Sequence, residues 1–273
     1  MDNYRGQHDT KKYKAELVDL LRRIGVVLSR NKISYFGVFG TCLGAAREGG
    51  IIPWDDDVDI AIHRRDFIHA KDILDESDQE VYVEHMGFRR ARIFNRIMEA
   101  DSIERKRAYV DLYVIDNVPE SYIRYKWDVL WYVGLSRILA RRKKSLANTH
   151  PWLHFAADFI TFPFRVLPSK WVEKVAEWFY VFSKKSLLVK LSFDANRKRY
   201  EANWFQDSVQ VPFDDISIPI PKKYDPYLTK CYGNWRVPPE EKDRYSHAFD
   251  RSGANWSVPL PDDDARRLIN IGK

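Results

Sequence analysis

The apolar positions near the N-terminus repeat with a helical period. Leu17, Leu21, Ile24 and Leu28 follow one another at spacings of four, three and four residues. Such spacings are typical of one face of an amphipathic helix. The pattern predicts a helix over residues 10–29, with Asp9 or Thr10 as its N-terminal cap.

Short apolar runs follow, and their length is typical of strands. They cover residues 34–39, 58–62, 81–84, 88–94 and 108–115. After the first run, Gly40 and Thr41 are expected to open a short helix that continues to Arg47, and Gly49-Gly50 is expected to form a turn. This order of elements predicts an α+β or α/β core with a site at the strand ends.

Residues 122–191 differ in character, because Trp and basic residues are frequent there. Two interpretations compete. The segment is a helical subdomain with a solvated basic edge, or it is an element on a membrane surface, where aromatic and basic side chains suit the headgroup region. The later Pro-rich stretch predicts an extended segment that wraps a surface, with one short helix over residues 227–232.

These patterns divide the chain into four parts. We expect a catalytic core, a helical aromatic and basic region, a C-terminal part that wraps the core, and a tail, over residues 1–120, 121–191, 192–256 and 257–273.

Composition narrows the class of protein. Hydrophobic residues make up 45% and charged residues 31% of the 273 positions, which excludes a disordered chain. The net charge of +6 favours an anionic partner such as a nucleotide, a phosphorylated glycan, a nucleic acid or an acidic membrane. The two cysteines, Cys42 and Cys231, lack the spacing of a zinc site or disulfide scaffold, so a cytoplasmic location is expected. The polar N-terminus excludes an ordinary secretory signal, and no apolar run reaches the ~18 residues of a membrane-spanning helix.

Four carboxylates lie within residues 55–59. Asp57 and Asp59 would leave the same face of a strand, and two like charges held that close require a positive partner. Carboxylate oxygens suit a magnesium-type cation. Asp55 and Asp56 are expected to be supporting turn residues, with Asp56 on the opposite face.

Asp111 interrupts the apolar run over residues 108–115. A buried carboxylate without a partner is costly. Asp111 is therefore either structural, bonded to an arginine or to backbone amides, or the third carboxylate of the metal site.

The sequence resembles the LicD family, which includes bacterial phosphocholine transferases and the fukutin-related proteins. The resemblance rests on residues 40–47 and 52–60, on Val110-Asp111-Leu112, and on segments 227–233 and 238–242, with His247 beyond. It implies a nucleotidyltransferase-like mixed β-sheet with flanking helices, in an α+β fold with an inserted Trp-rich helical region. Cys42 and Tyr113-Val114 depart from the family pattern without removing a carboxylate.

The resemblance also implies an activity: transfer of phosphocholine or an alditol phosphate from a CDP-activated donor to a glycan hydroxyl, with release of CMP. Asp57 and Asp59 would hold Mg²⁺ or Mn²⁺. Asp111 would be the acceptor's general base or a ligand of a second metal ion. Gly40 and Thr41, at the N-terminus of the short helix, would approach the donor phosphates.

Four further residues are candidates for donor binding. Arg47 and Arg92 would hold the transferred phosphate, although Arg47 is also placed to pair with Glu48 or Asp55. Trp54 would stack on the donor or simply pack beneath the site. His247 would contact the substrate.

Two other functions remain open from the sequence. One is a nucleotidyltransferase that leaves a nucleoside monophosphate on the acceptor. The other is a non-catalytic module that binds a membrane or a nucleic acid, although no known nucleic-acid motif is present. The partners expected for the transferase are the CDP-activated donor, a glycan or lipid-linked oligosaccharide acceptor, and an anionic membrane on whose inner face the protein would be peripheral.

Overall fold

The computed structural model describes residues 3–77, 81–85, 90–95, 108–123, 171, 187–191 and 198–240. The chain forms two compact units. The first consists of Met1–Glu84, Ala91–Ile115 and Asn203–Lys273, and the second of His85–Arg90 and Asp116–Ala202.

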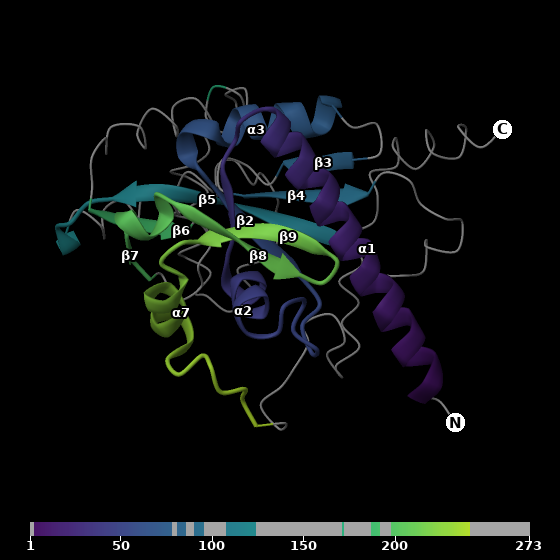
Figure 1. Ribbon diagram of the computed structural model, residues 1–273. Helices are drawn as coiled ribbons and strands as arrows, with labels where there is room; N and C mark the ends of the chain where they lie inside the picture. Colours follow the sequence, from purple (N-terminus) through teal and green to yellow (C-terminus); the bar gives the residue numbers. More distant parts are fainter. Residues whose placement is uncertain are drawn as a thin grey trace, which may run out of the picture. The chain divides into compact units, whose positions relative to one another are not determined.

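A mixed β-sheet forms the centre of the first unit, with strand order β1-β2-β5-β4-β3 (Figure 1). β1 runs antiparallel to β2, whereas β2 and β5 are parallel. Together with the helices, this sheet confirms the α+β class. In sequence order the strands are β1 (Tyr35–Gly37), β2 (Val58–His63), β3 (Val81–His85), β4 (Arg90–Asn95) and β5 (Tyr109–Val118). Every residue of β2 except the last is buried, so the acidic segment leads into the interior of the sheet.

The first helix is longer than predicted. α1 spans Asn3–Arg30, so Asp9 and Thr10 lie inside it and the prediction that one of them caps it is wrong. No proline separates residue 3 from residue 10, and nothing in that stretch forces the helix to begin later. α2 spans Phe39–Arg47, as expected within one residue. α3 (Arg64–Ser77) was not predicted, although its buried residues have helical spacing: Phe67, Ala70 and Leu74.

The Pro-rich segment forms a two-stranded hairpin of β8 (Ser208–Phe213) and β9 (Ile216–Pro221). β8 and β9 form a sheet of their own, so each has an unpaired edge that tolerates proline. Asp214 in the turn docks the hairpin on the Gly49-Gly50 turn. Its backbone N–H donates to Gly49 O at 2.7 Å, and its Oδ2 accepts from Ile51 N at 3.0 Å. After the hairpin the chain forms α7 (Tyr224–Tyr232).

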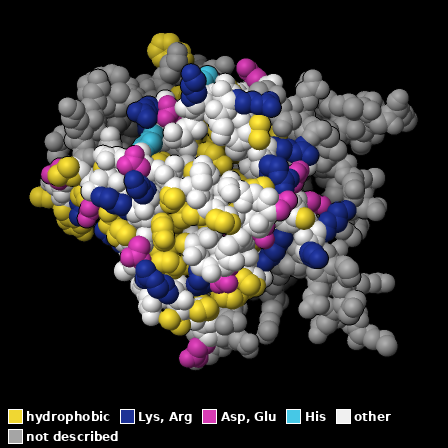
Figure 2. Space-filling model, in the orientation of Figure 1, with side chains coloured by type: hydrophobic (Ala, Val, Ile, Leu, Met, Phe, Trp, Pro, Cys, Tyr) yellow, Lys and Arg dark blue, Asp and Glu magenta, His cyan; other side chains and the backbone are white. Residues whose placement is uncertain are grey.

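In the second unit, β6 (Leu188–Leu191) pairs antiparallel with β7 (Tyr200–Glu201). Most of residues 121–191, which carry the helical and membrane-surface interpretations, lie outside the described residues, as do His247 and the tail. On the face drawn in Figure 2, the coloured Lys and Arg side chains alternate with Asp and Glu and do not gather into one basic patch.

Candidate active site

Three carboxylates meet in the loop immediately before β2. Asp55, Asp56 and Asp57 each offer an oxygen within 4.8 Å of the others. The strand begins at Val58, so Asp57 lies in the loop and not on the strand. The loop geometry therefore brings Asp55 and Asp56 beside Asp57, whereas strand alternation would have separated Asp56 from it.

The electrostatics of this loop are those of crowded like charges. Burial raises the pKa of Asp57 well above its usual range, and the charges of Asp55, Asp56 and Asp111 add to the effect. Burial also raises the pKa of Asp55, partly offset by hydrogen bonds from Asp57 and from the backbone N–H of Asp56. Burial and mutual repulsion thus disfavour the charged forms of Asp55 and Asp57, and a bound cation would offset both effects.

Asp59 and Asp111 occupy paired positions on β2 and β5, and both are buried. Side chains at paired positions leave the same face of a sheet, so these two carboxylates share a face. Arg92 Nε donates to Asp111 Oδ1 at 3.0 Å, and its guanidinium lies 4.5 Å from the ring centroid of Tyr109. Asp111 thus has the arginine partner that the structural interpretation required, and it still contributes to the field on Asp57.

The start of α2 lies against the carboxylate loop. A Cβ at position 40 would collide with Asp55 Oδ2, so glycine allows this carboxylate to approach the backbone. Thr41 Oγ1 accepts a hydrogen bond from Asp59 N at 2.7 Å, which ties α2 to β2. Phe39, just before them, has φ +46°, a strained conformation that Tyr227 supports by accepting from Phe39 N at 3.0 Å.

Arg47 has several partners within the protein. Its Nε donates to Glu48 Oε1 at 2.7 Å and its Nη1 to Trp235 O at 3.0 Å. Its guanidinium lies 5.8 Å from the ring centroid of Trp54. Arg47 therefore forms an ion pair with Glu48, one of the two partners that the sequence suggested for it. Trp54 packs against the guanidinium of Arg47.

Two α1 residues at this site were missed by sequence reasoning. Lys14 Nζ donates to Ile52 O at 2.8 Å and Pro53 O at 2.9 Å, the carbonyls that precede the acidic loop. Tyr13 is buried, and its pKa is raised by burial and by neighbouring charges that include Asp56 and Asp57. The sequence offered one indication for Lys14, which lies three residues before Leu17 and therefore on the apolar face of the helix.

The sheet, the acidic loop and the start of α2 all lie in the part of the chain that resembles a known family. Residues 32–133 match the family described as LicD/FKTN/FKRP, nucleotidyltransferase domain. This match confirms, for that part of the chain, the resemblance seen in the sequence.

Two relatives illustrate the extent of the similarity. The chain is 26% identical over 253 residues to the lipopolysaccharide cholinephosphotransferase LicD of Haemophilus influenzae, covering 84% of this chain and 92% of that protein. It is 33% identical over 111 residues to an uncharacterized protein of Rickettsia prowazekii, covering 39% of this chain and 41% of that protein.

Proposed function

We propose that the chain transfers a phospho-alcohol, either phosphocholine or an alditol phosphate, from a CDP-activated donor to a hydroxyl of a cell-surface glycan or its lipid-linked precursor, releasing CMP. The observation that carries this proposal is the carboxylate loop immediately before β2, whose three oxygens lie within 4.8 Å of one another. The Haemophilus influenzae relative, named as a lipopolysaccharide cholinephosphotransferase, supports phosphocholine and a lipopolysaccharide-type acceptor.

The carboxylate oxygens of this loop are suitable ligands for a hard divalent cation. Asp55, Asp56 and Asp57 supply carboxylate oxygens, and the pKa of Asp57 is raised by burial and then by neighbouring like charges, both of which a bound cation would offset. We expect these residues, with Asp59 and Asp111 beside them, to hold Mg²⁺ or Mn²⁺. When bound, the cation would neutralise charge that develops on the donor diphosphate.

The chain's own residues would then orient the reaction. Asp111 would accept the proton of the attacking hydroxyl or hold a second cation, and Arg92 would keep its carboxylate oriented in either case. The acceptor oxygen forms a bond to the transferred phosphorus as the bond to the CMP oxygen breaks. The backbone of Gly40, at the start of α2, would lie close enough to the site to approach the donor phosphates.

Product mass tests the proposal. The full chain is incubated with Mg²⁺, lipopolysaccharide and CDP-choline, CDP-ribitol or CDP-glycerol in turn. A gain of phosphocholine or alditol phosphate supports the proposal, whereas a gain of nucleoside monophosphate indicates a nucleotidyltransferase and overturns it. If no donor yields a modified lipopolysaccharide, the acceptor class is wrong.

Asparagine variants test the carboxylates. Asp57→Asn and Asp59→Asn should each lower the transfer rate at least about 100-fold, as expected when a group that stabilises the transition state is lost. Asp72→Asn is the matched control, because Asp72 is exposed on α3, and it should retain the wild-type rate. Equal transfer rates in all three variants would show that Asp57 and Asp59 do not take part in the reaction.

A further inference from the structure

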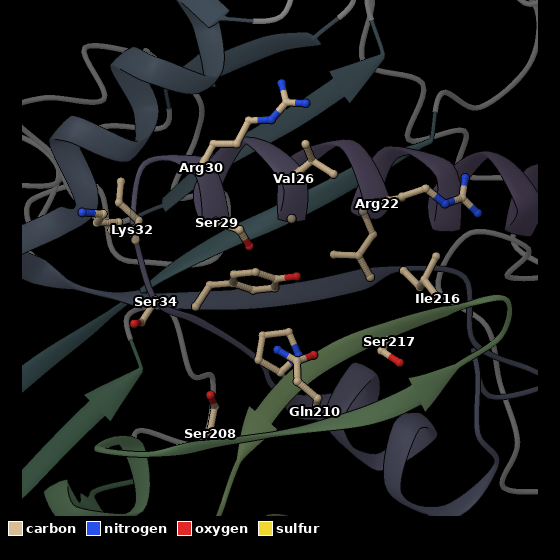
Figure 3. Close-up of a pocket in the computed structure, with 15 residues that line it drawn as sticks. Arg22, Val26, Ser29, Arg30, Lys32, Ser34, Ser208, Gln210, Ile216 and Ser217 are labelled. Atoms are coloured by element: carbon tan, nitrogen blue, oxygen red, sulfur yellow. The ribbon is translucent and has the colours of Figure 1, made fainter.

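A second candidate site lies between the C-terminal half of α1 and the hairpin β8–β9 (Figure 3). The cavity has a volume of about 690 Å³, which is within the usual range for small-molecule sites. Its walls come from α1, from the connection to β1 and from both hairpin strands. All of these elements belong to the first unit, so the cavity is formed within one compact body.

This cavity is separate from the carboxylate site. Tyr35, which lines it, pairs with Ile62 in the β1–β2 ladder, so their side chains leave the same face of the sheet. Ile62 is three residues beyond Asp59 on β2, and side chains an odd number of residues apart leave opposite faces. A ligand in the cavity would therefore lie on the face opposite to Asp59.

The polar lining suits a ligand that carries hydroxyl groups. Figure 3 shows Ser29 of α1 and Gln210 of β8 extending into the gap between helix and hairpin. Hydroxyl and amide groups both donate and accept, as sugar hydroxyls do. Tyr35 adds an aromatic ring and a phenol, and burial raises its pKa to about 12, so the phenol keeps its proton. Other hydroxyls on the wall belong to Ser34, Ser208 and Ser217.

Two cations lie at the end of α1, on the rim of this cavity, and Figure 3 shows their side chains extended outward, so a bound anion would draw them toward the gap. Within the described residues, neither Arg30 nor Lys32 has a side-chain hydrogen bond or ion pair, and both are exposed. Arg22, also on the wall, differs because it is paired with Asp19 at 2.7 Å and with Asp215 at 2.6 Å. Arg30 and Lys32 are thus available to an anionic group.

A glycine keeps the cavity open. Gly25 lies inside α1, where glycine is less favourable than alanine. A Cβ at this position would lie 2.7 Å from the hydroxyl oxygen of Tyr35, so alanine would displace the phenol that lines the cavity. The position therefore offers a way to alter the site without removing a charge.

We propose that this cavity binds a phosphorylated saccharide, with the phosphate at Arg30 and Lys32 and the sugar hydroxyls on Ser29 and Gln210. A free sugar phosphate and a phosphorylated glycan chain share this chemistry. The proposal is independent of the transfer reaction.

Calorimetric titration of the full chain, with EDTA to exclude binding through divalent cations, tests the proposal. The probes are mannose 6-phosphate, mannopentaose 6-phosphate, mannose and inorganic phosphate. Both phosphorylated sugars should bind at least about tenfold more tightly than mannose or phosphate alone. A pentasaccharide that binds a further tenfold more tightly would identify a glycan chain as the ligand, whereas equal affinities would identify a free sugar phosphate.

Three variants locate the binding. The double variant Arg30→Ala with Lys32→Ala should weaken binding of the phosphorylated sugars at least tenfold, and Gly25→Ala should weaken it several-fold without lowering the thermal unfolding midpoint. Lys11→Ala, an exposed charge on the same helix, should leave the affinity unchanged. The proposal is overturned if neither phosphorylated sugar binds, or if binding persists undiminished in both the double variant and Gly25→Ala.

Discussion

Gly40 illustrates how closely one residue controls the acidic loop. Alanine at this position would place a Cβ against Asp55 Oδ2, and the loop would have to move. We expect Gly40→Ala to lower the transfer rate about 100-fold, because the carboxylates lose their arrangement, and to reduce the free energy of unfolding by about 1–3 kcal/mol. Steady-state kinetics and denaturant titration measure the two effects.

Gly49→Ala is the control for this change. Gly49 has φ +72°, and a Cβ added there would meet no atom within 4 Å, so alanine introduces only backbone strain, about 1–2 kcal/mol. Its transfer rate should stay near wild type. A comparable loss of rate in both variants would mean that the contact between Gly40 and Asp55 has no special role.

His63 gives a prediction for acid stability. Its Nε2 lies 2.9 Å from Phe205 O, and burial lowers its pKa below 6.5. The unfolded state therefore binds more protons than the folded state as the pH falls below 6.5, so this contribution to stability is complete above that pH and is lost below it. For one proton, the free energy of unfolding changes by at most about 1.4 kcal/mol per pH unit.

Urea titrations between pH 5 and about pH 8 would measure this slope. His63→Gln keeps a side-chain donor without an imidazole, so its free energy of unfolding should fall less on acidification than that of the wild type. Parallel pH profiles for the two proteins would show that His63 does not titrate on unfolding.

At the scale of elements, α1 supports the acidic loop. Lys14 donates hydrogen bonds to two backbone carbonyls that directly precede that loop, although it is 38 residues away from Ile52 in sequence. We expect Lys14→Ala to lower the affinity for Mg²⁺ about 10- to 100-fold, as is typical when a group that orients metal ligands is removed. Lys14→Arg should recover part of the loss, and Lys11→Ala should have no effect.

Titration with Mg²⁺ while following the transfer rate measures this affinity. A positioning role predicts a higher Mg²⁺ requirement with nearly normal turnover at saturating Mg²⁺. A fall in turnover that added Mg²⁺ cannot restore, or an unchanged requirement, would contradict it.

The sequence predicted the strands of the core well, because each apolar run is short and bounded by polar or glycine residues. It predicted the hairpin β8–β9 only as an extended segment. Proline lacks the backbone N–H that would bond to a neighbouring strand, but this does not show which strand the segment pairs with. The start of α1 was missed because residues 3–10 carry no apolar stripe and are helical as an extension of the amphipathic part.

The site was predictable where chemistry is local in sequence. Asp57 and Asp59 stand out as neighbours, and Asp111 stands out as a charge in an apolar run. The grouping of Asp55 and Asp56 with Asp57 depends on loop conformation, and alternation along an assumed strand gave the opposite expectation. Lys14 could not be assigned, because its contact depends on how α1 packs across the loop.

At the scale of the whole molecule, the net charge of +6 predicts attraction to anionic surfaces. Among the helices that the structure describes, none is both long and apolar enough to cross a membrane. On the face drawn in Figure 2, basic and acidic side chains alternate, which does not favour that face for membrane contact. The run of four basic residues at 141–144 is the better candidate in the sequence.

We therefore expect the protein to sediment with vesicles that contain phosphatidylglycerol and to remain in the supernatant with phosphatidylcholine vesicles. Binding should weaken as salt rises from 0.05 to about 0.5 M, because the charges are screened within a few ångströms at the higher concentration. Replacing residues 141–144 by glutamate should abolish sedimentation, whereas Lys11→Glu combined with Lys222→Glu should reduce it only slightly. Equal recovery in the supernatant with and without anionic vesicles would contradict a membrane-surface role. The net positive charge would then be explained by attraction to the phosphates of the donor and the acceptor.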